Sequence, residues 1–213
     1  MIRPDLVAGV PVLFVMAAEA EYGPCLRSRI HPLITGIGPI EAAVSLTAAL
    51  SAQAAVGALP QLIVNLGSCG SRSLAQASVH QVASVSWRDM DASPLGFEKG
   101  RTPLLDLPAE IALPHRVPGL PAARLSTGAN IVSGAGYDGI DADMVDMETF
   151  AVLRAAQRFG VPLIGLRGVS DGAEELRVLS DWTRLLGEID RALAVAVDAL
   201  HDALAAGELD LGG

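Results

Sequence analysis

Short apolar runs alternate with longer Ala- and Leu-rich segments along the chain, and this alternation restricts the possible folds more than any other feature. The runs have the length of strands, whereas the longer segments carry apolar side chains at helical spacing, most clearly between Leu185 and Leu204. The pattern predicts strands over 10–15, 33–35, 62–65, 79–87, 124–127, 144–147 and 162–169, and helices over 40–56, 148–159 and 185–204. Strands that alternate with helices in this way indicate an α/β fold with a largely buried sheet.

The composition is typical of one aliphatic domain. Of the 213 residues, 51% are hydrophobic, which is enough for one sizeable core, so we expect a single domain over residues 1–213 without linkers or repeats. Aromatic residues make up only 4%, so we expect a core of packed aliphatic layers. The formal net charge is −9 and the basic residues are scattered singly, which argues against a nucleic-acid partner.

The N-terminal run from Val7 to Ala18 superficially resembles a signal peptide, because an arginine precedes it. A proline within the run and two glutamates directly after it favour a first β-strand instead. No run reaches the roughly 18–20 apolar residues of a membrane span. Cys25 and Cys69 are too few for a disulfide framework and lack metal-ligand spacing, which favours reduced thiols and a cytoplasmic location. The histidines show no ligand pattern either, so we expect no metal or organic cofactor.

Three acidic residues, Glu21, Glu148 and Asp171, each follow a predicted strand. Open α/β sheets place their sites where strands end, and a carboxyl group there is poorly solvated on one side. Its pKa can therefore rise enough for the group to donate a proton. Each acid also has a purely structural interpretation. Glu148 could complement the dipole of the following helix, Asp171 could cap a turn beside Gly172, and Glu21 could be a solvated surface acid.

Two glycine-rich turns are predicted at Gly36-Ile37-Gly38 and Gly67-Ser68-Cys69-Gly70, where the backbone would allow close approach of a ligand. Neither is a dinucleotide-binding loop or a Walker loop, since the GxGxxG pattern and the Lys-Ser/Thr pair are absent. Ser68 and Ser170 lack the context of a nucleophile elbow, so the sequence gives little support to a Ser-His-Asp triad.

Seven segments, taken in order, resemble the methylthioadenosine/S-adenosylhomocysteine nucleosidases of the purine nucleoside phosphorylase superfamily. They are AAEAE (17–21), TGIG (35–38), NLGSCG (65–70), DMDASPLGFEKG (89–100), STGAN (126–130), VDMETFA (145–151) and RGVSDGA (167–173). The resemblance implies a three-layer α/β fold with a central mixed, partly barrel-like sheet flanked by helices. It also implies a homodimer, for which the helix over 40–56 could supply the interface or could instead belong to the core.

The resemblance implies a role for each matching residue. Asp171 matches the general acid at N7 of the purine, Glu21 matches the base that deprotonates the attacking water, and Glu148 matches the carboxylate that holds the ribose hydroxyls. The pocket for the sugar and the base is implied for Ile37, Ser68, Asn130, Ile131, Val132, Met147 and Ser170. Leu95 and Phe97 match the loop around the 5′ substituent, which in this family commonly reaches into the site of a dimer partner.

Hydrolysis and phosphorolysis both occur in this superfamily, and the sequence favours hydrolysis. Phosphorolytic bacterial relatives carry an arginine immediately before their version of the Gly-Ser-Cys-Gly stretch, because phosphate needs cations or oriented amides. Here Asn65 precedes Leu66-Gly67-Ser68, and the first strand leads into glutamates that would repel phosphate but suit water. A phosphate-dependent phosphorylase is the alternative.

Departures from the family pattern leave the substrate open. Residues 21–34 are too few for the hairpin usual there, and Ala129 replaces an aspartate near the base. Leu95 and Lys99 stand where the family often has aromatic residues, and Trp182 is the candidate for the aromatic that caps the purine. A futalosine-like nucleoside is therefore an alternative substrate, and a nucleoside-binding protein without catalysis is an alternative class.

Overall fold

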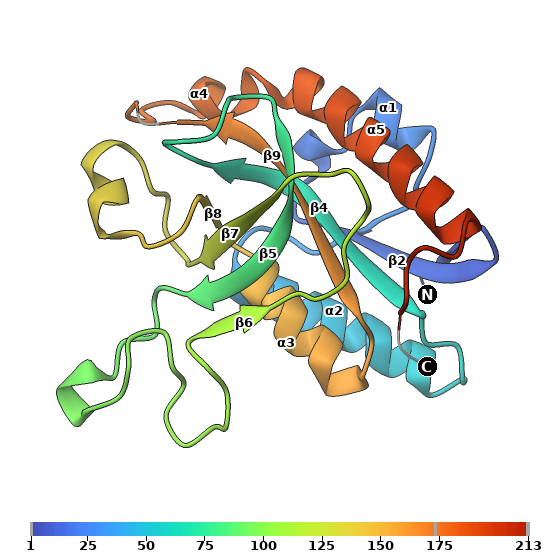
Figure 1. Ribbon diagram of the computed structural model, residues 1–213, viewed down its shortest axis with the longest axis horizontal. Helices are drawn as coiled ribbons and strands as arrows, with labels where there is room; N and C mark the ends of the chain where they lie inside the picture. The colour runs from blue at the N-terminus through green and yellow to red at the C-terminus, as the bar shows by residue number, and fades with distance from the viewer. Residues whose placement is uncertain (1, 173, 212–213) are drawn as a thin grey trace.

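The computed structural model describes residues 2–172 and 174–211, and within them the backbone forms a nine-stranded mixed sheet with helices on two sides (Figure 1). The strands are β1 (Asp5–Val7), β2 (Val10–Met16), β3 (Leu33–Ile34), β4 (Leu62–Gly70), β5 (Val79–Trp87), β6 (Glu110–Ala112), β7 (Ala122–Thr127), β8 (Met144–Asp146) and β9 (Leu163–Asp171). The helices are α1 (Pro24–Arg27), α2 (Pro39–Ala54), α3 (Thr149–Phe159), α4 (Leu179–Thr183) and α5 (Leu186–Ala205). Short 3₁₀ turns are η1 (Glu19–Glu21), η2 (Ser93–Leu95) and η3 (Gly134–Gly139).

Part of the sheet closes on itself. The strand order is β1-β2-β4-β8-β7-β5-β6, and β9 pairs with both β4 and β5. It runs parallel to β4 and antiparallel to β5, so β4, β8, β7, β5 and β9 form a ring. The remaining strands extend from this ring, with β3 beside β2. The mixed, partly barrel-like sheet predicted from the sequence is confirmed.

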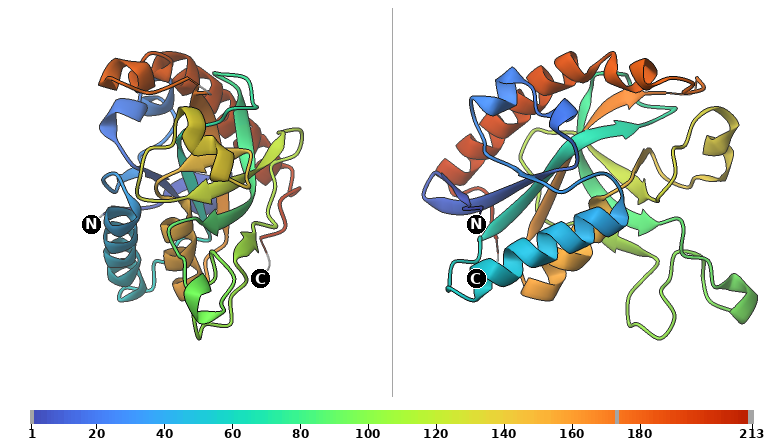
Figure 2. Two further views of the ribbon diagram at one scale, coloured as in Figure 1. Left: turned by 90° about the vertical axis from the view of Figure 1, so that its left-hand side faces the viewer. Right: turned by 180° about the vertical axis from the view of Figure 1, so that it is seen from behind.

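Helices cover both faces of the sheet and make the two outer layers (Figure 2). α2 and α3 lie on one face, where Leu46 and Leu50 belong to the same core as Val152. α5 crosses the other face with Leu193 and Leu200 fully buried, and α1 packs against it. Aliphatic side chains dominate both cores, and the three layers predicted from the sequence are confirmed.

β9 is the strand most enclosed by the fold. All nine of its residues are buried, because it pairs on both edges and is covered on both faces. Gly165 and Gly168 leave room for Val82 and Ile189, whose side chains would overlap a Cβ at these two positions. The strand ends at Asp171, so a fully buried strand delivers a carboxyl group to the end of the barrel.

The predicted elements are confirmed to within two residues at each end, except that β4 continues to Gly70 instead of ending at Asn65. The predicted glycine-rich turn over 67–70 is therefore wrong. These residues pair with β9 over 167–171, and this tertiary pairing keeps a segment of low strand propensity extended.

Short elements were not predicted from the sequence. They include β1, β6, α1 and α4. Ala173, the last residue of the RGVSDGA segment, lies outside the described residues. Among the helices of the described part, none combines the length and the apolar character needed to cross a membrane.

Candidate active site

A cavity of about 510 Å³ lies where β4, β8 and β9 end, and segments that follow β2, β5 and β7 complete its wall. Most of the residues singled out in the sequence line this cavity. They are Glu21, Ile37, Ser68, Asn130, Ile131, Val132, Met147, Glu148, Ser170 and Asp171. The fold thus brings all three candidate acids to one place.

Glu21 lies in η1, directly after β2, and is only 6% exposed. Its Oε1 accepts hydrogen bonds from the backbone N–H of Ser68 at 2.7 Å and from the Ser68 hydroxyl at 2.6 Å. Its Oε2 is buried and has no hydrogen-bond partner among the described residues. Because buried polar atoms are normally hydrogen-bonded, Oε2 marks a position for a polar ligand such as water.

Gly67 and Trp182 complete the surroundings of Glu21. A Cβ at position 67 would lie 3.3 Å from both carboxylate oxygens, so the glycine lets Glu21 approach β4 closely. The indole N–H of Trp182 donates to Ser68 Oγ at 2.9 Å, and the Ser68 hydroxyl hydrogen is directed to Glu21. Trp182 lines the cavity and links α4 to the hydrogen bonds of Glu21.

Glu148 immediately precedes α3, but it makes no capping hydrogen bond to that helix. Its Oε1 instead accepts a hydrogen bond from the backbone N–H of Gly38 at 2.8 Å. Gly36 and Gly38 have φ of 90° and 101°, a region that favours glycine, and this explains the two glycines of the turn. Burial first, and then the negative charge of Asp146, raise the pKa of Glu148 to about 7.

Asp171 is the last residue of β9 and is 8% exposed. The Ser170 hydroxyl donates to its Oδ1 at 2.7 Å. Burial raises the pKa of Asp171 above its usual range, although hydrogen bonding from Ser170 and from Tyr137 acts in the opposite direction. The raised pKa favours the protonated carboxyl, which is the form that can donate a proton to a ligand.

Arg167 was not a candidate from the sequence, yet it is among the largest fully buried side chains. Its Nη2 donates to Asp146 Oδ2 at 2.8 Å and to Thr149 Oγ1 at 2.6 Å, and it also bonds to Asn65 Oδ1. A Cβ at Gly67 would lie 2.5 Å from its Nη1, so the guanidinium meets the same glycine as Glu21. This buried cation offsets the negative charge of Asp146 and makes the cluster of acids tolerable. A lone arginine inside an apolar strand is the sequence signal that could have revealed it.

The chain is similar to several bacterial 5′-methylthioadenosine/S-adenosylhomocysteine nucleosidases. It is 28% identical to that of Haemophilus influenzae strain PittEE over 161 residues, which cover 67% of this chain and 68% of the relative. It is 29% identical to that of Halalkalibacterium halodurans over 187 residues, which cover 74% and 75%. The family model of the phosphorylase superfamily matches residues 127–205. The chain is thus similar to this superfamily over its C-terminal part.

Solved structures show the same fold at low sequence identity. The native futalosine hydrolase of Helicobacter pylori strain 26695 has a TM-score of 0.74 at 19% identity, covering 90% of this chain and 97% of that chain. The Campylobacter jejuni 5′-methylthioadenosine/S-adenosylhomocysteine nucleosidase has a TM-score of 0.73 at 15% identity, covering 92% and 99%. The nucleoside phosphorylase-like fold therefore extends over most of the chain.

Arg88, which the sequence did not single out, supports one wall of this cavity. Its Nη1 donates to the carbonyls of Ser126 at 2.5 Å and Asp146 at 3.1 Å. Its Nη2 donates to the carbonyl of Asn130 at 2.7 Å. Both Nη atoms are held by backbone oxygens, whereas the buried Nε has no hydrogen-bond partner among the described residues. The bonds of the Nη atoms fix residues 126–130 against the end of β8.

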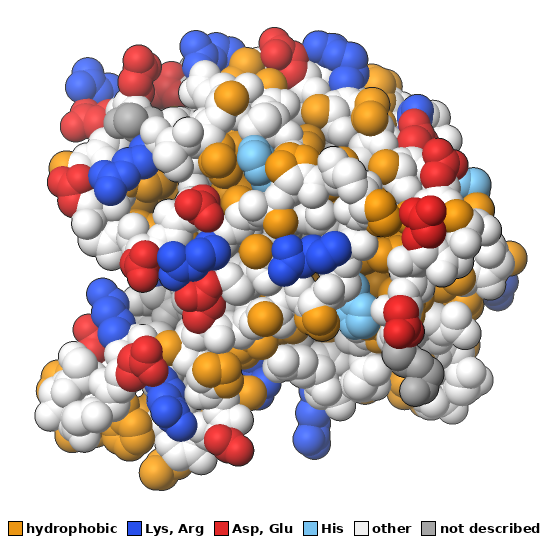
Figure 3. Space-filling view, in the orientation of Figure 1, with side chains coloured by type: hydrophobic (Ala, Val, Ile, Leu, Met, Phe, Trp, Pro, Cys, Tyr) orange, Lys and Arg blue, Asp and Glu red, His pale blue; other side chains and the backbone are white. Residues whose placement is uncertain are grey.

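Leu95 and Phe97 do not line the cavity of their own chain. They lie in or beside η2, where Leu95 is 78% exposed. This segment projects from the rest of the molecule and forms a separate lobe on its surface (Figures 1 and 3). Their contact with the 5′ substituent in a partner's site stays a prediction.

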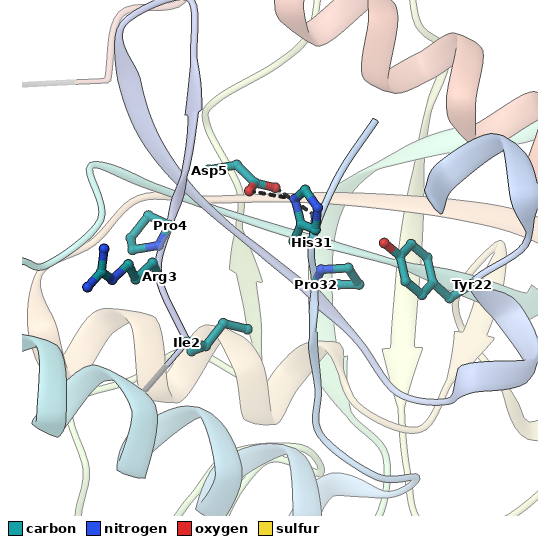
Figure 4. Close-up of a pocket in the computed structure, with 7 residues that line it drawn as sticks. All are labelled: Ile2, Arg3, Pro4, Asp5, Tyr22, His31 and Pro32. Carbon is teal, nitrogen blue, oxygen red and sulfur yellow. Dashed lines mark hydrogen bonds and ion pairs between the residues drawn. The ribbon is translucent and has the colours of Figure 1, made fainter. Parts of the chain in front are cut away.

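A second hollow of about 440 Å³ lies between the N-terminal segment and residues 31–32 (Figure 4). Asp5 is the acidic residue of this hollow. Its Oδ2 accepts a hydrogen bond from the backbone N–H of His31 at 2.7 Å, and its Oδ1 lies 3.1 Å from Nδ1 of the His31 imidazole. The Tyr22 hydroxyl is bonded to the Ile30 carbonyl. These polar groups are paired with protein, so this hollow lacks the free acids of the first. Nowhere in residues 2–172 and 174–211 do His, Cys, Asp and Glu side chains gather in a group suited to a metal ion.

Proposed function

We propose that this protein hydrolyses the N-glycosidic bond of a purine nucleoside of the 5′-methylthioadenosine/S-adenosylhomocysteine type, giving free base and a ribose derivative. The observation that carries the proposal is the convergence of Glu21, Glu148 and Asp171 on one cavity, each in a different environment. Glycoside cleavage needs an acid at the leaving group and a base for water, and different surroundings allow carboxyl groups to hold different protonation states.

Asp171 acts as the general acid. It donates its proton to N7 of the purine, the bond from C1′ to N9 breaks with its electron pair going to the base, and the sugar becomes oxocarbenium-like. Water bound at Oε2 of Glu21 attacks C1′ and loses a proton to that carboxylate. Glu148 accepts hydrogen bonds from the ribose hydroxyls, and Met147 packs against the sugar, so the reacting atoms stay aligned.

The surroundings of Glu21 favour water over phosphate as the nucleophile. A carboxylate with a free oxygen occupies the position beside Ser68, and it would repel an anion. Arg167 is paired with Asp146, and both Nη atoms of Arg88 already donate to backbone carbonyls, so neither side chain presents a free Nη fork to phosphate. Phosphorolysis would require a different source of positive charge.

We propose further that the protein works as a homodimer in the cytoplasm. Leu95 and Phe97 would complete the 5′ subsite of a partner, because they are held away from the cavity of their own chain. The exposed side chains of Ile40 and Val44 on α2 lie near Ile37 at the cavity and supply an apolar face for such contact. Cys25 and Cys69 are both free thiols, which supports a reducing compartment.

The test is release of free base from methylthioadenosine, S-adenosylhomocysteine, adenosine, inosine and futalosine, each with and without phosphate. We expect phosphate-independent release of adenine from the thioether nucleosides. Release only with phosphate, together with ribose 1-phosphate formation, would establish a phosphorylase. Preferential release of hypoxanthine from futalosine would identify the alternative hydrolase.

Asp171→Asn tests the role of the acid. We expect kcat to fall by roughly 10²–10⁴-fold while nucleoside binding, measured by calorimetry, is retained, because only proton donation is lost. Asp202→Asn, which alters an exposed carboxyl group on α5, is the matched control and should leave kcat unchanged. If the unaltered protein binds nucleoside but never releases base, it is a binding protein and the proposal is wrong.

A further inference from the structure

Tyr137 is a buried phenol whose hydroxyl lies beside Asp171. It lies in η3, is 3% exposed and packs with Val132 and Val145 in a small apolar cluster. Among the described residues its hydroxyl has no partner at full hydrogen-bond geometry, but it lies close enough to Asp171 to lower the pKa of that carboxyl group. A buried phenol hydroxyl normally has a partner, so this side chain requires an explanation beyond packing.

The hydroxyl of Tyr137 meets Asp171 above Gly70. A Cβ at Gly70 would overlap the Tyr137 hydroxyl and would lie 2.7 Å from Asp171 Oδ2, so both groups share the space that the glycine leaves. Tyr137 is not part of the cavity wall, whereas Asp171 is. The phenol therefore approaches the carboxyl group from within the protein, on a side that a bound nucleoside does not occupy.

We propose that Tyr137 is a positioning residue for the general acid, and that its O–H donates to Asp171 Oδ2 once Asp171 has given its proton to the purine. This inference rests on the proposed function. The neutral carboxyl group does not need the bond, but the carboxylate forms a stronger, charge-assisted one. The bond therefore stabilises the state after proton transfer more than the state before it, and this difference lowers the barrier.

Protons and electrons are conserved in this step. One proton moves from Asp171 to N7 of the purine, and the electron pair of the glycosidic bond goes to the base. Tyr137 keeps its own proton throughout, because burial and the charge of Asp171 raise its pKa. The phenol acts only as a hydrogen-bond donor.

Other charged or titratable groups do not compete for this role. Those around the pair are Cys69 of β4, Arg88 after β5, Glu175 and Arg177 after β9, and Glu21 and Glu148 in the same cavity. The thiol stays neutral because burial raises its pKa, and Arg88 is held by backbone carbonyls. The exposed pair after β9 is joined at 2.9 Å, and the two cavity glutamates are bonded to Ser68 and Gly38.

Tyr137→Phe tests the proposal, because it removes the hydroxyl and keeps the ring. The pKa of Asp171 is measured by ¹³C NMR titration of labelled carboxyl groups, with Asp171→Asn assigning the signal. We expect Tyr137→Phe to raise this pKa by roughly one unit, since a donor to the ionised form is lost. In the pH profile of kcat, the limb at which the acid loses its proton should shift to higher pH by the same amount. The value of kcat on the plateau should fall about tenfold.

Tyr22→Phe is the matched control, because it removes the chain's other phenol hydroxyl at the second hollow. It should leave the pKa of Asp171 unchanged. A Tyr137→Phe protein that unfolds at a different temperature but keeps the pKa of Asp171 would overturn the proposal. The titration needs no turnover. If Tyr137→Phe raises the pKa of Asp171 but the unaltered protein releases no base, only the proposed function is overturned.

Discussion

Glu148 lies buried beside Asp146, and its pKa of about 7 links substrate binding to stability. In the proposed role the ionised carboxylate of Glu148 holds the ribose hydroxyls, so kcat/KM should fall as the pH drops below about 7. Its ordinary pKa is 4.5, and the folded protein therefore holds this proton more tightly than the unfolded chain does. Stability is consequently highest below pH 4.5 for this group, decreases between 4.5 and 7, and is constant above that range.

Glu148→Gln should therefore stabilise the protein at pH 8 while it impairs catalysis. The amide oxygen can still accept from Gly38, but no charge is buried, so we expect about 1–3 kcal/mol more stability at pH 8 and little difference at pH 4.5. Urea unfolding at both pH values measures this, and kcat/KM should fall at least tenfold. Glu188→Gln, at an exposed position of α5, is the control and should change neither quantity. An equal change for Glu148→Gln at both pH values would rule out ionisation as the cause.

Among the elements, α1 depends on a carboxylate from a distant helix. Asp190 of α5 is 2% exposed, and its two oxygens accept hydrogen bonds from the backbone N–H groups of Cys25 and Leu26 at 2.9 Å each. These groups begin α1 and would otherwise lack partners. Because α1 follows η1 directly, Asp190 also fixes the segment that carries Glu21.

Asp190→Asn should lower the stability by about 1–3 kcal/mol, because one buried charge-assisted hydrogen bond is lost and a mismatched amide replaces it. Asp198→Asn on the same helix is the control, since that exposed carboxylate forms a surface ion pair with Arg29 and should contribute less than about 1 kcal/mol. Urea unfolding of both variants measures the difference. Equal effects would mean that the bonds to α1 do not hold this segment in place.

The long elements could be predicted from the sequence, whereas the short ones could not. Helical or strand periodicity in α5 and β5 is visible locally, but α1 exists because Asp190, far along the chain, supplies its hydrogen bonds. The same holds for the site. The acids were predicted because each follows a strand. The role of Arg167 depends on its ion pair with Asp146, and the role of Tyr137 depends on its position behind Asp171, and neither contact is visible in the sequence.

At the scale of the whole molecule, a projecting segment and the outer face of α2 are exposed to solvent in the described part of the single chain. The segment that carries Leu95 and Phe97 projects from the body, and α2 lies across the outer surface in the rear view (Figure 2). The exposed residues of α2 are Ile40, Glu41, Val44, Thr47, Ala48, Ser51 and Ala54, and Glu41 is the charged residue among them. Monomers rarely expose such apolar faces beside a binding cavity, and this favours a homodimer.

Val44→Glu should disrupt the proposed dimer, because a charge would be buried in an apolar contact without a partner. Val44 is 61% exposed in the single chain, and Val195 of α5 is 66% exposed, so Val195→Glu is a matched control for adding the same charge elsewhere. We expect sedimentation of Val44→Glu as a monomer, sedimentation of Val195→Glu as a dimer, and at least tenfold lower kcat/KM for the former alone. The loss of activity follows if Leu95 and Phe97 complete the partner's site, because a monomer leaves the 5′ subsite open. A fully active monomer would instead show that each chain is complete by itself, and a Val44→Glu dimer would place the interface elsewhere.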